Sequence, residues 1–240
     1  VATNTCSPIQ IDSDVTSIAC GWNHILYLKT NGDLYGAGYS GYGQLGLGVA
    51  TTTPPTFIRS GVSAVAANCY HSLFITEGGD LYGMGQNTSG QLGNGTIANQ
   101  GTPIRIDTDV SAAAAGNMHS LYIKTDGRLF AVGANTYGAL GDGSTTGRTT
   151  PVQVATNAVR CSAGGHFSIF TTDSGALYAM GLNADGELCN ASLASKASPT
   201  ATTLTGVSTT GAAISAGWNH IAAITADGTL WVCGSTDYGE

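Results

Sequence analysis

The sequence predicts an all-β protein, a β-propeller built from five copies of a four-stranded antiparallel blade. A glycine-rich block, for example "EGGDLYGMGQNTSGQLGNGT" (residues 77–96), occurs five times along the 240 residues. A histidine and a short apolar run, as in "HSLFITE", precede each copy, and these histidines recur every 47 to 54 residues. Repeats of this length are typical of propellers and other stacked arrays. No stretch of useful length shows helical periodicity.

Each repeat is predicted to contain four strands in a fixed order. In the second copy, "VSAVAA" (62–67) and "HSLFIT" (71–76) form the first two strands, and a Gly-Gly turn leads into "DLYGMG" (80–85). Dipeptides such as Asn31-Gly32 occupy this turn in other copies and favour type I′ hairpins. A long S-x-G-Q-L-G-x-G loop follows, and "TPIRI" (102–106) closes the repeat. The glycine that ends each third strand is expected to permit close backbone approach between blades.

The pattern H-x-L-x-L-K-x-D-G-x-L-[YF]-x-x-G-x-N-x-x-G-Q-L-G-x-G resembles the regulator of chromosome condensation repeat. Five copies match it from about Val15 to Glu240, which is essentially the whole chain. The resemblance implies a propeller that usually has seven blades. Members of this family have unrelated tasks, so the resemblance alone does not imply guanine-nucleotide exchange.

Residues 1–240 are predicted to form a single propeller domain. The repeats are expected at approximately 15–58, 62–106, 110–154, 158–204 and 207–240. Residues 7–12 resemble the fourth strand of a preceding or closing blade. Two interpretations follow. In the first, which we favour because the sequence stops inside a loop motif, the chain is part of a longer, seven-bladed ring. In the second, residues 9–11 close a five-bladed ring and so remove its exposed edges.

Composition argues against two classes of partner. Charged residues are 10% of the chain, and 8 basic residues against 15 acidic ones give a net charge of −7. The basic residues form no cluster, so nucleic-acid binding, which needs a basic patch, is not expected. No run of about 20 apolar residues is present, so membrane insertion is not expected either. The low charge and the many Thr and Asn residues favour an extracellular surface or a virion.

The six cysteines are predicted to be free thiols that pack as small apolar side chains. They are Cys6, Cys20, Cys69, Cys161, Cys189 and Cys233, and they lie at different positions of the repeat. Strands in adjacent blades rarely bring such positions within the Cα separation of about 4.4 to 6.8 Å that a disulfide needs. Free thiols leave a reducing cytoplasm possible.

Catalytic, cofactor and metal sites are not predicted. The five histidines, His24, His71, His119, His166 and His220, share one repeat position. Equivalent positions on neighbouring blades lie too far apart for one ion with bonds of about 2.0 to 2.1 Å, so these side chains are interpreted as structural. The sequence also contains none of the G-x-S-x-G, H-E-x-x-H or G-x-x-x-x-G-K motifs. We therefore expect no enzyme activity.

Partner binding is predicted at one end of the blades. In an up-and-down blade, the turn before the second strand and the long loop after the third strand lie at the same end. These segments vary between repeats and carry aromatic and Met residues, which are enriched in interface cores. The opposite end carries mainly polar hairpin turns. The predicted binding residues are Trp22, Tyr39, Tyr42, Tyr70, Met118, Tyr137, Trp218 and Tyr238.

Two classes of function are compatible with these features. The first is a non-enzymatic module that binds a protein or glycan, as a structural or receptor-binding component of an extracellular or virion assembly. The alternative is a regulatory domain that acts on an enzyme, similar to the exchange factors or the enzyme inhibitors among propellers of this repeat family. The repeats lack the long insertion that an exchange factor of the family uses as a wedge, apart from six or seven extra residues near "ASLASKASPTATTLTG".

Overall fold

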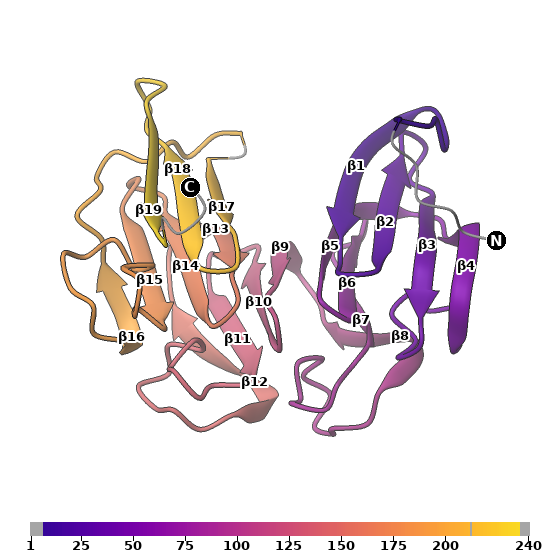
Figure 1. Cartoon of the computed structure of the whole chain (residues 1–240), viewed down its shortest axis with the longest axis horizontal. Helices are drawn as coiled ribbons and strands as arrows, with labels where there is room; N and C mark the ends of the chain where they lie inside the picture. Colours follow the sequence, from indigo (N-terminus) through magenta and orange to yellow (C-terminus); the bar gives the residue numbers. More distant parts are fainter. Residues whose placement is uncertain (1–6, 212, 236–240) are drawn as a thin grey trace.

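The computed structural model describes residues 7–211 and 213–235, and these residues form five antiparallel sheets. Four sheets have four strands and the last has three, and no helix occurs in the described part of the chain. The all-β class and the four-stranded blade are therefore confirmed. Figure 1 shows the sheets following one another in an arc, from β1–β4 to β17–β19.

Strands at equivalent positions recur in the same order in all blades, although β17 is shorter and β4 longer than their equivalents. The first strands are β1 (Val15–Cys20), β5 (Val62–Asn68), β9 (Val110–Ala115), β13 (Ala158–Ala163) and β17 (Ile214–Ala216). The second strands are β2 (His24–Lys29), β6 (His71–Thr76), β10 (His119–Lys124), β14 (Phe167–Thr172) and β18 (His220–Ile224). The third strands are β3 (Leu34–Ser40), β7 (Leu81–Gly85), β11 (Leu129–Gly133), β15 (Leu177–Gly181) and β19 (Leu230–Gly234). The fourth strands are β4 (Ala50–Arg59), β8 (Gln100–Asp107), β12 (Arg148–Ala155) and β16 (Lys196–Ala201).

Within each sheet the strands pair in chain order, so each blade is a simple meander. The first strands of successive blades contact one another in the order β1, β5, β9, β13 and β17. The second strand of a blade also packs against the first strand of the next blade, as β6 does against β9. This arrangement places the first strands on the inner side of the arc.

The hairpins between the second and third strands differ in type from the prediction. In the first blade only Gly32 has a positive φ, 81°, while Asn31 does not. The Gly32 N–H donates to Lys29 O (3.0 Å), and the Lys29 N–H donates to Asp33 O (2.9 Å). These bonds define a three-residue hairpin in which a type I turn is followed by a left-handed glycine. The type I′ prediction is wrong because a single left-handed residue closes this turn.

The hydrophobic core lies between blades. Leu34, for example, packs against Val62, Phe74 and Met84 of the second blade. The equivalent Leu81, Leu129 and Leu177 are at most 1% exposed, as their shared position predicts. The same repeat position in the sequence predicts burial for the fifth member, Leu230, and this prediction is wrong because Leu230 is 64% exposed. The described residues provide no sixth blade to cover that side of β19.

A histidine at the start of the second strand connects three pairs of blades. His24 Nε2 lies 2.8 Å from Ser72 Oγ, His71 Nε2 lies 3.0 Å from Ser120 Oγ, and His119 Nε2 lies 2.9 Å from Ser168 Oγ. Ser120 Oγ donates its proton to Gln91 O (2.8 Å), so it accepts the Nε2–H of His71. The histidines therefore lock neighbouring blades in register, as their structural interpretation requires.

His166 does not belong to this set. In β14 the residue that pairs with the terminal glycine of the third strand is Phe167, opposite Gly181, just as His119 lies opposite Gly133. The prediction that all five histidines share one repeat position is therefore wrong for His166, which lies one residue before the strand. The fourth blade carries a buried phenylalanine where the others carry histidine.

The glycine that ends each third strand faces a carbonyl of its own blade. Gly85 has a φ of 102°, and a Cβ there would collide with Tyr70 O. The next residue, Gln86, donates its N–H to the same carbonyl (2.8 Å). The contact with Tyr70 O is within the blade, where it fixes the residue that precedes the second strand. A Cβ on Gly85 would also meet Gln44 Cα of the first blade, so at this glycine the predicted close approach between blades is present as well.

One pair of cysteines contradicts the prediction of free thiols. Cys189 and Cys233 form a disulfide, with their Cα atoms 5.9 Å apart. Cys189 replaces the second glycine of the loop motif, whose equivalents include Gly93 and Gly141. A Cβ on Gly141 would point at Met180, and Cys233 holds the Met180 position in the fifth blade. The loop geometry therefore brings these two positions together. Cys20, Cys69 and Cys161 are free, and Cys6 lies outside the described residues.

The segment before β1 contacts the first blade as the end of a fourth strand would. Asp12 accepts hydrogen bonds from Lys29 Nζ (2.8 Å) and Tyr27 Oη (3.1 Å). Asp107, the last residue of β8, makes the same two bonds to Lys124 and Tyr122 of the third blade. Residues 7–12 are not assigned to a strand, but Asp12 occupies the place that follows one.

Core packing predicts a stability contrast between two equivalent leucines. Replacing Leu129 by Ala should lower the free energy of unfolding by about 2 to 5 kcal/mol, because the buried side chain leaves a cavity. The matched change Leu230→Ala should cost less than about 0.5 kcal/mol, since this leucine is exposed. Urea unfolding followed by circular dichroism measures both. Equal losses would show that the interblade core is assigned wrongly.

Because the buried histidines resist protonation, we expect the free energy of unfolding to fall already at pH values above those at which carboxylates titrate. Burial lowers the pKa of His119 to about 4 and that of His71 to about 3. The unfolded chain therefore binds these protons at higher pH than the folded chain, so stability is full above about pH 6.5 and falls as the pH drops toward 4. His119→Phe, which introduces the side chain that Phe167 provides in the fourth blade, should reduce the loss between pH 7.5 and pH 5 by about 2 kcal/mol. An unchanged pH dependence in urea unfolding would contradict this assignment.

Candidate functional site

The turns before the second strands and the loops after the third strands lie at one end of the blades, which we call the loop face. The turns are residues 21–23, 69–70, 116–118, 164–166 and 217–219, and the loops are residues 41–49, 86–99, 134–147 and 182–195. Backbone hydrogen bonds join turns of neighbouring blades. The Trp22 N–H donates to Cys69 O (3.2 Å), and the Gly165 N–H donates to Trp218 O (3.0 Å). The turns therefore form a continuous row.

A buried asparagine holds each of three loops in shape. Asn87 Oδ1 accepts the N–H of Leu92 (2.9 Å), while its Nδ2 donates to Ala98 O (3.1 Å). Asn135 and Asn183 make the corresponding bonds in the next two blades. With the amide satisfied and buried, the loop tip is rigid, and Asn87 is not accessible although it lies in an N-x-S/T sequence.

Each loop tip contacts the last turn residue of the next blade, and four junctions repeat this contact with different chemistry. The Tyr42 and Tyr70 ring centroids lie 5.0 Å apart, and Ser89 Oγ lies 3.6 Å from Met118 Sδ. At the third junction the Tyr137 and His166 ring centroids are 5.3 Å apart. At the fourth, Asn219 Nδ2 donates to Asp185 Oδ2 (3.4 Å). One scaffold thus presents a variable pair of side chains at every junction.

Most of the predicted binding residues come together on the loop face. Tyr70 contacts Trp22 (5.4 Å between ring centroids) and Tyr39 (6.3 Å) as well as Tyr42. Trp22 also lies 5.6 Å from Trp218, so rings of the first and fifth blades meet. Trp22 and Trp218 remain 56% and 42% exposed, which leaves ring surface open to solvent. Met118 and Tyr137 lie at neighbouring junctions, and Tyr238 lies outside the described residues.

His166 joins this cluster, although the sequence analysis did not place it there. Its ring lies between Tyr137 (5.3 Å) and Trp218 (6.2 Å), and it occupies the turn position of Tyr70 and Met118. Aligning "FSIF" with "HSLY" instead of aligning the histidines would have revealed this place. Burial lowers the pKa of His166, so the imidazole is neutral at neutral pH.

Ion pairs occur at both ends of the blades and are more numerous at the hairpin end. The hairpin end carries the ion pairs Lys29–Asp12 (2.8 Å), Lys124–Asp107 (2.7 Å) and Arg128–Asp126 (2.7 Å). The loop face carries the pair Arg148–Asp142 (2.7 Å) beside its aromatic cluster. Between residues 7 and 235, apart from residue 212, no group of three potential metal-ligating side chains was found. The aromatic side chains are therefore the feature that distinguishes the loop face.

A membrane-spanning helix is likewise not found among the described residues.

Comparisons with known proteins identify the repeat. A family model described as the RCC1-like domain matches residues 2–240. Human WBSCR16 is similar in structure, with a TM-score of 0.82 and 22% identity over 94% of this chain and 63% of that one. Yeast RCC1 (Prp20) bound to Kap60 matches with a TM-score of 0.80 and 22% identity over 93% of this chain and 56% of that one. No curated protein sequence matches significantly.

A further structure, of Saccharomyces cerevisiae Prp20p, was described together with its binding to Gsp1p and histones. It matches with a TM-score of 0.80 and 23% identity, over 93% of this chain and 57% of that one. The chain thus spans between about half and two thirds of the length of the structures it matches. At these identities the structural similarity shows the shared fold.

The expectation of a structural or receptor-binding part in a virion or extracellular assembly is wrong. The match to the RCC1-like domain along residues 2–240, together with the fold shared with RCC1 (Prp20) and WBSCR16, overturns it. The error has a compositional cause. Abundant Gly and Thr follow from the tight turns and short strands of every blade, so they do not report the compartment.

Proposed function

Because the chain belongs to the RCC1-like domain family, we propose that it is a non-catalytic regulatory propeller that binds an enzyme through its loop face. The observation that carries this proposal is the contiguous aromatic cluster of Trp22, Tyr39, Tyr42, Tyr70 and Trp218. Trp and Tyr side chains in such a cluster supply most of the binding energy at protein interfaces. The rigid loops keep the cost of ordering this surface low.

The chemistry of the loop face supports a protein partner. The cluster combines exposed ring surface with hydroxyl, indole N–H and imidazole groups, a mixture typical of interface centres. Asp185 and Asn219 add a polar edge at the fourth junction. The turns of the loop face are similar in backbone shape, but the five rings of the cluster meet at one place. We therefore assign the partner's central contact to that place.

The partner class that we propose is a small GTPase. Prp20p, which shares the fold, was described with its binding to Gsp1p. Regulation then takes one of two forms. An exchange factor stabilises the nucleotide-free GTPase and speeds GDP release, whereas an inhibitor binds the loaded enzyme and leaves GDP release unchanged or slower. These forms differ in which nucleotide state binds more tightly.

We also propose that this chain forms five blades of a seven-bladed ring. The exposed Leu230 on β19 and the exposed Ile18 on β1 mark two apolar blade faces that further blades would cover. The Asp12 contacts with Lys29 and Tyr27 support a preceding blade whose fourth strand ends at residues 7–12.

Charge substitution at the cluster should weaken binding to the GTPase. Tyr70→Asp should reduce affinity by about 30-fold, a loss typical of a central contact, and Met118→Lys, at the neighbouring junction, should reduce it by a smaller factor. Asn31→Lys, in a hairpin at the opposite end, serves as the matched control and should change affinity less than about threefold. Isothermal titration against nucleotide-free and GDP-loaded Gsp1p measures these values.

The rate at which the GTPase releases a fluorescent GDP analogue distinguishes the two forms of regulation. An exchange factor should raise this rate, whereas an inhibitor should leave it unchanged or lower it. If Asn31→Lys lost binding while Tyr70→Asp kept full binding, the interface would lie at the hairpin end, and its assignment to the loop face would be wrong. Absence of binding in both nucleotide states would remove Gsp1-type GTPases as the partner class.

A further inference from the structure

A stacked pair of aromatic rings fills the same place in each of the first four blades. One ring comes from the middle of the second strand, and the other from the residue opposite it on the third strand. Their centroids lie 5.1 to 5.4 Å apart and their planes are within 12° of parallel. The pairs are Tyr27–Tyr35, Phe74–Tyr82, Tyr122–Phe130 and Phe170–Tyr178.

The fifth blade keeps one ring of this pair and lacks the other. Trp231 on β19 lies opposite Ala223 on β18, in the register that pairs Tyr178 with Phe170 on the preceding blade. With alanine at this position, the indole has no stacked partner from β18. Trp231 is 52% exposed, in part because the described residues place no fourth strand beside β19. In the fifth blade, the space that an aromatic side chain at position 223 would fill is therefore empty.

A pocket occupies this space. It has a volume of about 260 Å³ and is lined by Leu204, Ile221, Ala223, Trp231 and the Cys189–Cys233 pair. Ile221 and Ala223 are buried, so its inner wall is dry and apolar. The disulfide ties the two blades together beside it, which limits how far the walls can collapse. A preformed apolar pocket of this kind is the usual setting for a small ligand.

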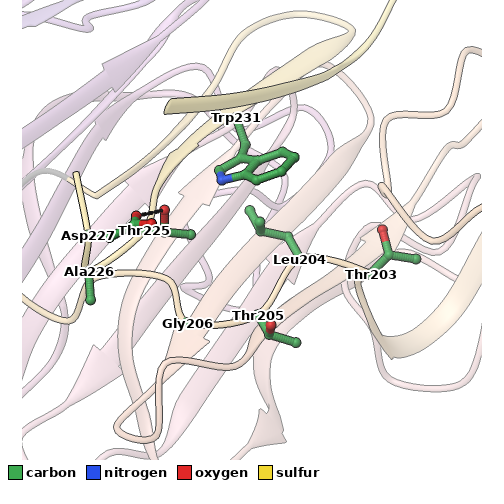
Figure 2. A pocket seen from close by; sticks show the side chains of 8 residues that line it. All are labelled: Thr203, Leu204, Thr205, Gly206, Thr225, Ala226, Asp227 and Trp231. Atoms are coloured by element: carbon green, nitrogen blue, oxygen red, sulfur yellow. Dashed lines mark hydrogen bonds between the residues drawn. The ribbon is translucent and has the colours of Figure 1, made fainter. Parts of the chain in front are cut away.

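A wider mouth of about 500 Å³ opens from the pocket past Trp231 and Leu204. Figure 2 shows the Trp231 indole above Leu204, with Thr225 and Asp227 to one side and Thr203 to the other. Thr225 Oγ1 donates to Asp227 Oδ1 (2.6 Å). This bond, with further hydrogen bonds to Asp227, lowers the pKa of its carboxyl, so the rim carries an ionised acceptor. The mouth therefore adds polar groups at its rim, while Leu204, Ala226 and Trp231 keep much of its wall apolar.

We propose that this pocket binds a planar aromatic ring of a small molecule, which takes the place of the ring that Ala223 lacks and packs against Trp231. The four intact pairs define the preferred occupant, since each uses a six-membered aromatic ring at this position. Offset stacking adds to the affinity that burial of the ring supplies. A hydroxyl on the ring can point to the rim and donate to Asp227. This site is separate from the loop face and does not rest on the regulatory function.

The test uses 4-methylphenol, which has the size of a tyrosine side chain. Titration into the protein, followed by the indole N–H signal of Trp231 in ¹H–¹⁵N spectra, should give a saturable shift. Trp231→Phe identifies that signal. Ala223→Phe restores the aromatic pair from within the chain, so it should weaken binding by at least about tenfold and raise the thermal midpoint of unfolding.

Phe57→Ala removes an exposed ring on β4 in the first blade and should leave the affinity unchanged. No saturable shift up to about 10 mM, where a ligand with a Kd of about 1 mM is mostly bound, would overturn the proposal. Undiminished binding in a folded Ala223→Phe would also overturn it. Should that variant fail to fold, Leu204→Phe, which fills the pocket from the linker, replaces it with the same expected loss.

Discussion

The packing of each blade against the next is the interaction on which the rest of this structure depends. A single four-stranded sheet cannot bury both of its faces, so every core cluster contains residues from two blades. Three junctions add a buried hydrogen bond from His24, His71 or His119 to a serine of the following blade. Protonation would place a second N–H on the imidazole, and the buried Nδ1 atoms of His24 and His71 have no acceptor among the described residues. The hydrogen bond therefore explains the register of the blades, while burial of the imidazoles lowers their pKa. The fourth junction has Phe167 instead, and there the Cys189–Cys233 disulfide connects the blades.

Fixed register has a consequence for the surface. Because each blade sits in one position against the next, a loop tip always meets the last turn residue of its neighbour. The backbone around this contact is the same at four junctions, while the side chains change from Tyr–Tyr to Ser–Met, Tyr–His and Asp–Asn. Variation in the residues at one repeat position thus changes the chemistry of the loop face without altering the fold. The fifth blade shows the same principle in the interior, where Ala223 in place of an aromatic ring opens a pocket beside Trp231.

The sequence predicted the fold class, the four strands of the first four blades and most members of the aromatic cluster, because glycine turns and the alternation of apolar residues are local signals. It failed where an outcome depends on the neighbouring blade. His166 was aligned by residue type, and only the pairing of Phe167 with Gly181 shows its true place. Cys189 and Cys233 are distant in sequence. They meet because the Cβ of the loop residue Cys189 points at the position that Cys233 holds in the next blade. Leu230 is exposed because its burial needs a blade beyond the described residues. The virion or extracellular assignment failed for another reason, since composition reflects the needs of the blade more than the partner.

The coupling between His71 and Ser120 tests the interblade hydrogen bond most directly. A double-mutant cycle with His71→Ala, Ser120→Ala and the double variant, measured by urea unfolding at pH 7.5, separates this bond from the loss of packing. If the bond holds the second and third blades in register, the two changes should be non-additive by at least about 1 kcal/mol. Additivity within about 0.3 to 0.5 kcal/mol would show that the two side chains act independently and would contradict this account of the junction.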